Sequence, residues 1–118
     1  MSDIQDLQDI VVKFRNDRDW KQFHNPKDVA LSLVLEAAEL MEHFQWKSEA
    51  EIAQYLKTHK EDVADELVDV FYWVLLIAKD LSIDLNEAMT RKMKQNEAKY
   101  PVSKAKGNHA KYTELSKE

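Results

Sequence analysis

The sequence contains one glycine, Gly107, in 118 residues, and this scarcity restricts the folds that the chain can form. Tight β-hairpin turns favour Gly because it adopts positive φ angles, and Gly-rich phosphate loops need several glycines close together. The composition therefore argues against a sheet with tight turns and excludes a dinucleotide-binding loop. Because the chain has no Cys, disulfides, thiolate nucleophiles and zinc sites with Cys ligands are also excluded. We expect an all-α fold.

Apolar residues recur at helical spacing in several segments, most of which begin with a capping residue. The patterns predict helices from a Ser2–Gln5 capping box to about Trp20, from Pro26 to about Phe44, from Ser48 to Leu56, from about Glu61 to Leu81, and from Asp84 to just before Tyr100. Four of these segments are long, which favours a four-helix-bundle-like fold. We expect a single domain, residues 1–118, of which about 102–118 form a basic C-terminal arm.

The net charge of −5 is divided unevenly along the chain. Residues 1–90 carry a net charge of −10, whereas residues 91–118 carry +5. An acidic body is a poor binder of polymeric nucleic acid, because contacts with phosphates need clustered cations. The basic end is either a solvated tail or a mobile arm that closes over an anionic ligand.

The length and the apolar pattern indicate where the protein works and how it assembles. No apolar run reaches the roughly 18–20 residues that a membrane span needs, and the acidic start MSDIQDLQDI is unlike a signal peptide. We therefore expect a cytoplasmic protein without membrane contact. A chain of this length builds only a thin core, and its apolar stretch 67–78 needs more cover than one bundle provides. We therefore expect a homo-oligomer.

Two pairs of acidic residues are the most informative feature of the predicted helices. Glu36 and Glu39 form one pair and Glu66 and Asp69 the other, each spaced so that both carboxylates share one helix face and repel each other. Asp69 is the only charge in residues 67–78, which read LVDVFYWVLLIA. A helix that is apolar nearly all round is a buried helix, where an ionised carboxylate needs a partner or a metal. This pattern predicts a functional role for Asp69.

The two pairs converge if their helices pack antiparallel, and the small Ala37 and Ala38 allow a facing helix to approach closely. A cluster of carboxylate oxygens suits Mg²⁺ or Mn²⁺, and Mg²⁺ commonly completes its coordination with phosphates of the substrate. A di-iron carboxylate bundle would need Glu-x-x-His motifs, which this sequence lacks. The residues therefore predict a site for Mg²⁺ or Mn²⁺ that acts on a phosphorylated substrate.

Five segments carry a resemblance to a known family by their order and spacing. They are RDWKQFHNP (18–26), EAAELMEHFQWK (36–47), DELVDV (65–70), KMKQNEAKYPV (92–102) and KYTEL (111–115). The set resembles the MazG-like family of all-α nucleoside triphosphate pyrophosphohydrolases, most closely its dCTP pyrophosphatase branch. Since the segments cover most of the chain from residue 18 to residue 115, the resemblance extends over the whole predicted fold.

The resemblance implies hydrolysis between the α and β phosphates of a nucleoside triphosphate, which releases a nucleoside monophosphate and pyrophosphate. It also implies a homodimer or homotetramer whose active site is built across chains. The implied metal ligands are Glu36, Glu39, Glu66 and Asp69, and the implied substrate-binding residues are Trp20, His24, Trp46, Trp73, Lys92, Asn96, Lys111 and Tyr112. Of the carboxylates, Glu36 or Glu39 is the candidate catalytic base that takes a proton from the attacking water.

Two positions depart from the family pattern. Trp73 stands where mammalian-like members carry Tyr, with Tyr72 one place earlier, and Val11 stands where a His is expected. Both positions bear on recognition of the base, whereas the metal positions show no departure. Two alternatives stay open: the same scaffold acting on dUTP, purine or phosphoribosyl nucleotides, and a non-enzymatic helical interaction module whose acidic face docks a basic partner.

Overall fold

The computed structural model describes residues 3–115, which form helices and no strand. The elements are α1 (Ile4–Asp17), the 3₁₀ helix η1 (Lys21–Phe23), α2 (Pro26–Glu42), α3 (Glu49–Asp80), α4 (Leu85–Lys99), α5 (Val102–Ala105) and α6 (Tyr112–Leu115). The predicted all-α class is confirmed. The chain divides into two compact units, one ending at Ile83 and the other beginning at Asp84. The expectation that residues 1–118 act as one domain stays a prediction.

The main helices begin at side-chain caps, because the first amides of a helix have no partner within it. The N-cap residues of α1, α2, α3 and α4 are Asp3, Asn25, Ser48 and Asp84. The capping box predicted at Ser48 is confirmed, since Ser48 and Glu51 each accept a hydrogen bond from the other's backbone amide. The cap predicted at Ser2 lies outside the described residues.

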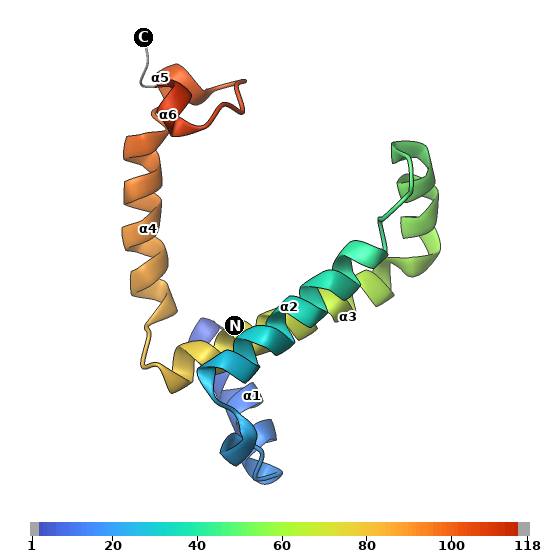
Figure 1. Ribbon diagram of the computed structural model, residues 1–118, viewed down its shortest axis with the longest axis vertical. Helices are drawn as coiled ribbons and strands as arrows, with labels where there is room; N and C mark the ends of the chain where they lie inside the picture. The colour runs from blue at the N-terminus through green and yellow to red at the C-terminus, as the bar shows by residue number, and fades with distance from the viewer. Residues whose placement is uncertain (1–2, 116–118) are drawn as a thin grey trace. The chain divides into compact units, whose positions relative to one another are not determined.

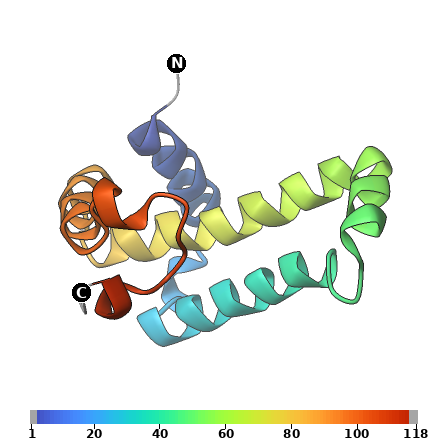
Figure 2. The same ribbon diagram turned by 90° about the horizontal axis from the view of Figure 1, so that it is seen from above.

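Helix α3 is continuous over 32 residues, so the prediction of two helices separated after Leu56 is wrong. The axis of α3 nevertheless turns between its first part and its longer remainder (Figure 2). Near the turn, the Tyr55 carbonyl accepts hydrogen bonds from Thr58 Oγ1 at 3.4 Å and His59 Nδ1 at 3.1 Å. Side chains that bond a helical carbonyl compete with the backbone ladder and bend a helix. The break predicted after Leu56 is therefore a bend in a continuous helix.

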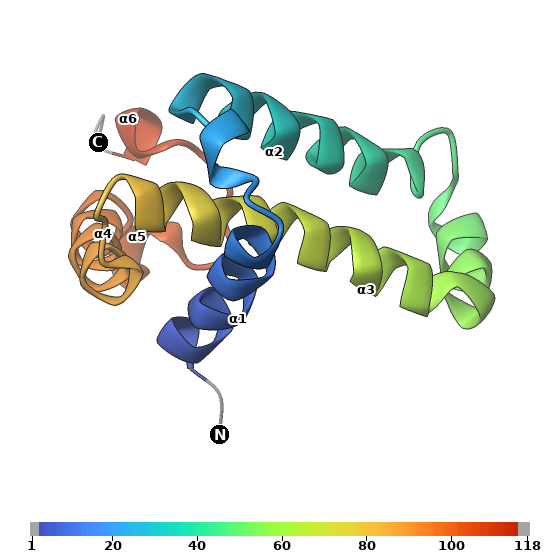
Figure 3. The same cartoon turned by 90° about the horizontal axis from the view of Figure 1, so that it is seen from below.

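Helix α2 lies beside the longer part of α3 and runs in the opposite direction, while α1 crosses α3 (Figures 1 and 3). This antiparallel arrangement is the one that the sequence analysis required for the two acidic pairs to converge. The buried apolar side chains of this first unit are Val29, Val63, Leu75, Leu76 and Ala78. The core is therefore small and lies mainly toward the C-terminal end of α3.

The beginning of the apolar segment 67–78 is not buried by this chain. Leu67 is 53% exposed and Val68 is 64% exposed, and Asp69 beside them is also exposed. The prediction that this helix is buried all round is therefore wrong for its first residues. The physical reason is that α1 and α2 cover only two sides of α3, so these apolar side chains remain available for contact with another molecule.

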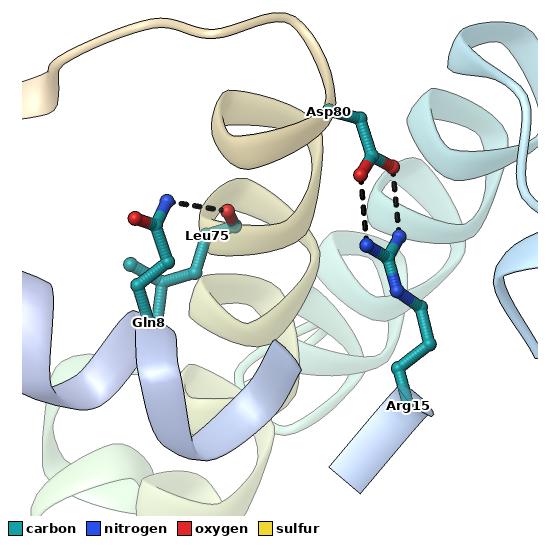
Figure 4. Close-up of polar contacts among 4 residues, drawn as sticks. All are labelled: Gln8, Arg15, Leu75 and Asp80. Carbon is teal, nitrogen blue, oxygen red and sulfur yellow. Dashed lines mark hydrogen bonds and ion pairs between the residues drawn. The ribbon is translucent and has the colours of Figure 1, made fainter. Parts of the chain in front are cut away.

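Two buried polar contacts join α1 to α3 (Figure 4). The Arg15 guanidinium, 1% exposed, donates two hydrogen bonds of 2.8 Å to the two carboxylate oxygens of Asp80. These hydrogen bonds lower the pKa of Asp80. The Gln8 side-chain amide donates to the backbone carbonyl of Leu75 at 3.0 Å. Together the two contacts attach α1 at points two helical turns apart.

The second unit contains α4, α5 and α6. Helix α4 ends at Lys99, immediately before Tyr100 and Pro101, as the sequence predicted. Residues 102–115 include two short helices on either side of Gly107, whose φ is +75°, and their role as a basic arm stays a prediction. The Tyr112 side chain packs edge-on against Tyr100.

None of the helices in the described part of the chain is long and apolar enough to cross a membrane.

Replacing Asp80 by Asn should destabilise the protein by about 3 kcal/mol, because the buried Arg15 charge would lose its counter-charge. Asp17→Asn is the matched control: it breaks the exposed Lys13–Asp17 pair and should cost less than about 1 kcal/mol. Urea unfolding measures both. Since the pKa of Asp80 is lowered, this stabilisation is present above its ordinary pKa and is lost as the pH falls through the folded value. Equal losses in the two variants would contradict the assigned role of the pair.

Candidate active site

Three carboxylates meet where α2 packs on α3. Glu36 and Glu39 come from successive turns of α2, Glu66 comes from α3, and each offers an oxygen within 4.8 Å of those of the other two. One oxygen of Glu36 and one of Glu66 are buried without a hydrogen-bond partner among the described residues. A buried polar atom without a partner is costly, so this arrangement favours a ligand that supplies positive charge.

The same crowding changes how these groups titrate. Burial, followed by the neighbouring Glu39 carboxyl and the charge of Asp69, raises the pKa of Glu36 to about 7. Burial and the charge of Glu39 also raise the pKa of Glu66. Carboxylates placed this closely resist ionising together. Glu36 therefore takes up a proton near neutral pH, and a bound cation would relieve the same repulsion.

The donor set of the cluster fits a hard divalent cation. All the donors are carboxylate oxygens, which suit Mg²⁺ and Mn²⁺ better than softer metals, and the two unpartnered oxygens of Glu36 and Glu66 are free to coordinate. Asp69, the fourth predicted ligand, lies next to the cluster: its charge acts on both Glu36 and Glu66, and it is exposed. The structure thus brings three of the four predicted ligands into one cluster, with Asp69 at its edge.

A cavity of about 410 Å³ opens beside the carboxylates. Its lining residues are Ile10, Val11, Phe14, Trp20, Glu36, Asp69, Tyr72 and Trp73. The aromatic rings contact one another edge to face, with centroid distances of 5.7 Å for Phe14–Trp20 and 4.9 Å for Tyr72–Trp73. A flat aromatic body can therefore sit against rings at one side of the cavity, with a metal-bound anion at the carboxylates.

The predicted base-binding residues occupy three different environments in the structure. Trp20 and Trp73 line the cavity. His24 does not line it, but its ring packs edge-on against Trp73 at 5.3 Å, and its Nδ1 is buried without a hydrogen-bond partner in the described part of the chain. Trp46 is 91% exposed in the loop between α2 and α3, and its φ of +67° lies in the left-handed region. Among the predicted base-binding residues, Trp46 is thus the one that this chain leaves almost entirely in solvent.

The predicted phosphate-binding residues belong to the second unit. Lys92 and Lys111 are exposed, and the half-buried Asn96 amide donates to the sulfur of Met93 at 3.6 Å. The Lys99 ammonium lies 4.9 Å from the centre of the Tyr112 ring. These residues are therefore within the described chain, and their role toward phosphate stays a prediction.

Sequence reasoning missed two members of the cavity wall, Ile10 and Phe14. Phe14 recurs at helical spacing with the other apolar residues of the first helix, a pattern that does not by itself indicate a cavity wall. The signal in the sequence is the number of apolar residues in that helix, and in the structure two of them stay accessible, Ile10 at 62% and Phe14 at 40% exposure. A helix with more apolar residues than its packing face requires has a second apolar surface to present.

Comparison with known proteins identifies the family of this chain. The MazG-like family model matches residues 31–115, which include both acidic pairs. The chain belongs to the MazG-like family. It is 40% identical to dCTP pyrophosphatase 1 of Rattus norvegicus over 114 residues, covering 95% of this chain and 67% of the relative. The human dCTP pyrophosphatase 1 is 37% identical over the same shares of the two chains.

A solved structure supports the fold as well. A pyrophosphatase from Archaeoglobus fulgidus is 39% identical and superposes with a TM-score of 0.79, covering 86% of this chain and 94% of that chain. These matches confirm the predicted family, the MazG-type fold and the prediction that the chain is an enzyme, a pyrophosphohydrolase. The alternative of a non-enzymatic interaction module is therefore not supported.

The raised pKa of Glu36 predicts a stability that depends on pH when no divalent cation is present. Because its pKa is higher in the folded chain, its contribution is fully present below the ordinary pKa and is lost as the pH rises through about 7. Glu36→Gln should therefore raise Tm more at pH 8 than at pH 5.5, measured by thermal unfolding in EDTA. Glu42→Gln, which changes an exposed residue of the same helix, should show no such difference. A Glu36→Gln effect that is equal at both pH values would contradict the crowding.

Proposed function

We propose that the chain hydrolyses nucleoside triphosphates between the α and β phosphates, with dCTP or related deoxynucleotides as preferred substrates. The observation that carries this proposal is the unpartnered carboxylate cluster beside an aromatic cavity, in a chain whose relatives are named dCTP pyrophosphatases. Clearance of nucleotides from the cellular pool is the role that fits such a reaction. The products are a nucleoside monophosphate and pyrophosphate.

The proposed metal ligands are Glu36, Glu39, Glu66 and Asp69, and the proposed cofactor is Mg²⁺, with Mn²⁺ as a substitute. When bound, such a cation neutralises phosphate charge and lowers the pKa of water. Glu36 or Glu39 accepts the proton of the attacking water, since both lie in the cluster and a carboxylate that is not saturated by the cation keeps a free lone pair. The antiparallel packing of α2 on α3 keeps these groups in place before substrate arrives.

The base of the nucleotide occupies the aromatic cavity in this proposal. Trp20 and Trp73 offer ring faces or edges to the base. His24 does not contact the base in this proposal, but holds the Trp73 ring through its edge-on contact. Base stacking on aromatic side chains contributes about 1–3 kcal/mol per base. The phosphate contacts proposed from the family pattern are Lys92, Asn96, Lys111 and Tyr112, whose charges and donors suit a triphosphate.

We further propose that the protein is a homodimer or homotetramer with an active site shared between chains. Leu31, Val34 and Leu35 are all more than half exposed and share one face of α2, and Leu67 and Val68 of α3 are also more than half exposed. Exposed apolar faces of this size are typical of interaction surfaces. Trp46 fits the same proposal, because an exposed tryptophan with positive φ is unfavourable in a free chain. A neighbouring copy of the chain would bury its indole ring.

Incubation with Mg²⁺ and each nucleoside triphosphate, followed by separation of the products, tests the reaction. We expect dCMP and pyrophosphate from dCTP, and the rates with dUTP, purine and phosphoribosyl nucleotides decide the substrate. Glu66→Ala and Asp69→Ala should each lower activity on the order of 100-fold, because each removes charge that holds the cofactor. Asp62→Ala, an exposed change on the same helix, should have no effect. Release of inorganic phosphate and dCDP would contradict cleavage between the α and β phosphates.

Trp46→Gly separates a substrate role from a folding role. Gly adopts the φ of +67° without strain, so the free energy of unfolding should change by less than about 1 kcal/mol. Loss of the indole should raise KM for the nucleotide about tenfold if the ring encloses the base. Gln45→Gly in the same loop is the control. Light scattering on the same samples shows whether the change also dissociates the oligomer, in which case Trp46 anchors the interface and does not bind the base.

A further inference from the structure

The cavity beside the carboxylates is built between two helices that the chain has to hold at a fixed distance. Ile10, Val11 and Phe14 of α1 form one wall, and Tyr72 and Trp73 of α3 form the other. The size of this space therefore depends on how α1 is seated on α3. A tilt or rotation of α1 would widen or narrow the space between the rings without touching the carboxylate cluster.

Two directional contacts determine that seating. The Gln8 amide bonds the Leu75 carbonyl at 3.0 Å, and the Arg15 guanidinium makes its two 2.8 Å bonds to Asp80 (Figure 4). Gln8 and Arg15 are seven residues apart, which places them on one face of α1, two turns apart. Val11 and Phe14 lie in the interval that these two contacts delimit. Apolar packing allows small sliding motions, whereas buried hydrogen bonds with defined geometry resist them.

A second connection, electrostatic in its first step, runs from the ion pair to the cavity wall. The charges of both Arg15 and Asp80 act on His24, and the His24 ring packs edge-on against Trp73 at 5.3 Å. The Trp73 ring in turn lines the cavity and contacts Tyr72 at 4.9 Å. The ion pair therefore influences both walls, through α1 on one side and through His24 and Trp73 on the other.

From this arrangement we infer that Arg15, Asp80 and Gln8 are positioning residues that set the width of the aromatic cavity and thereby select the base of the nucleotide. The inference rests on the proposed function, in which the base occupies this cavity. None of the three residues lines the cavity, so they act on the substrate only through the walls. Loosening them should weaken binding and selectivity and leave the hydrolytic step at the carboxylates intact.

The double variant Arg15→Met/Asp80→Leu tests this inference without leaving a charge buried. Replacing a buried ion pair by apolar residues of similar volume is often neutral or stabilising, so Tm should stay the same or rise. We expect KM for the best nucleotide to increase at least fivefold, with kcat within twofold of the unchanged protein. The preference for that nucleotide over the next best, as a ratio of kcat/KM values, should fall by a similar factor.

The matched control is Lys13→Met/Asp17→Leu, which replaces the exposed ion pair of the same helix and should leave KM and selectivity unchanged. Gln8→Met is an independent second variant: it removes only the bond to the Leu75 carbonyl and should change KM and selectivity in the same direction. It also keeps the test decisive if the double variant does not fold.

The outcomes separate this inference from the proposed function. Hydrolysis of nucleotides by the unchanged protein, with unaltered KM and selectivity in a folded double variant or in Gln8→Met, would overturn the positioning role and leave the proposed function standing. Absence of hydrolysis of any nucleotide by the unchanged protein would overturn both. A loss of kcat with unchanged KM would also overturn the inference, because it would place these residues in the chemical step.

Discussion

Repulsion between carboxylates is the interaction on which the rest of this structure depends. Packing α2 antiparallel on α3 buries apolar side chains, but it also brings Glu36, Glu39 and Glu66 within 4.8 Å of one another. A fold selected for stability alone would avoid this arrangement, since burial and like charge raise the pKa of Glu36 to about 7. Within the described residues, this cost falls at the carboxylate cluster, where the proposed cation would compensate it. Stability and function therefore favour different protonation states of the same residues.

Much of this arrangement could be predicted from the sequence because it depends on local rules. The caps at Asn25, Ser48 and Asp84 and the end of α4 before Pro101 follow from short-range hydrogen bonding and from the restricted backbone around proline. The convergence of the acidic pairs followed from their spacing and from one assumption, that the two helices pack antiparallel. The starts of α2, α3 and α4, the end of α4 and the centre of the candidate site were therefore accessible without a structure.

What the sequence could not predict depends on contacts between distant residues. The sequence predicted a break after Leu56, but the bonds from Thr58 and His59 to the Tyr55 carbonyl only bend α3, because the helix continues on both sides. The exposure of Leu67, Val68 and Asp69 depends on how far α2 and α1 extend over α3. The Arg15–Asp80 pair joins residues 65 positions apart, and no periodic pattern connects them. Periodicity identifies an apolar face, but not what covers it.

The three tryptophans of this chain experience three degrees of contact with solvent, which gives the protein an internal optical reporter. Trp46 is 91% exposed, Trp20 is 41% exposed at the cavity, and Trp73 is half-buried against His24. An aqueous quencher such as iodide will reach the indole of Trp46 first and that of Trp73 last. Occupation of the cavity and burial of the α2–α3 loop will therefore change different parts of the emission. Fluorescence can thus follow the two events separately, without any added label.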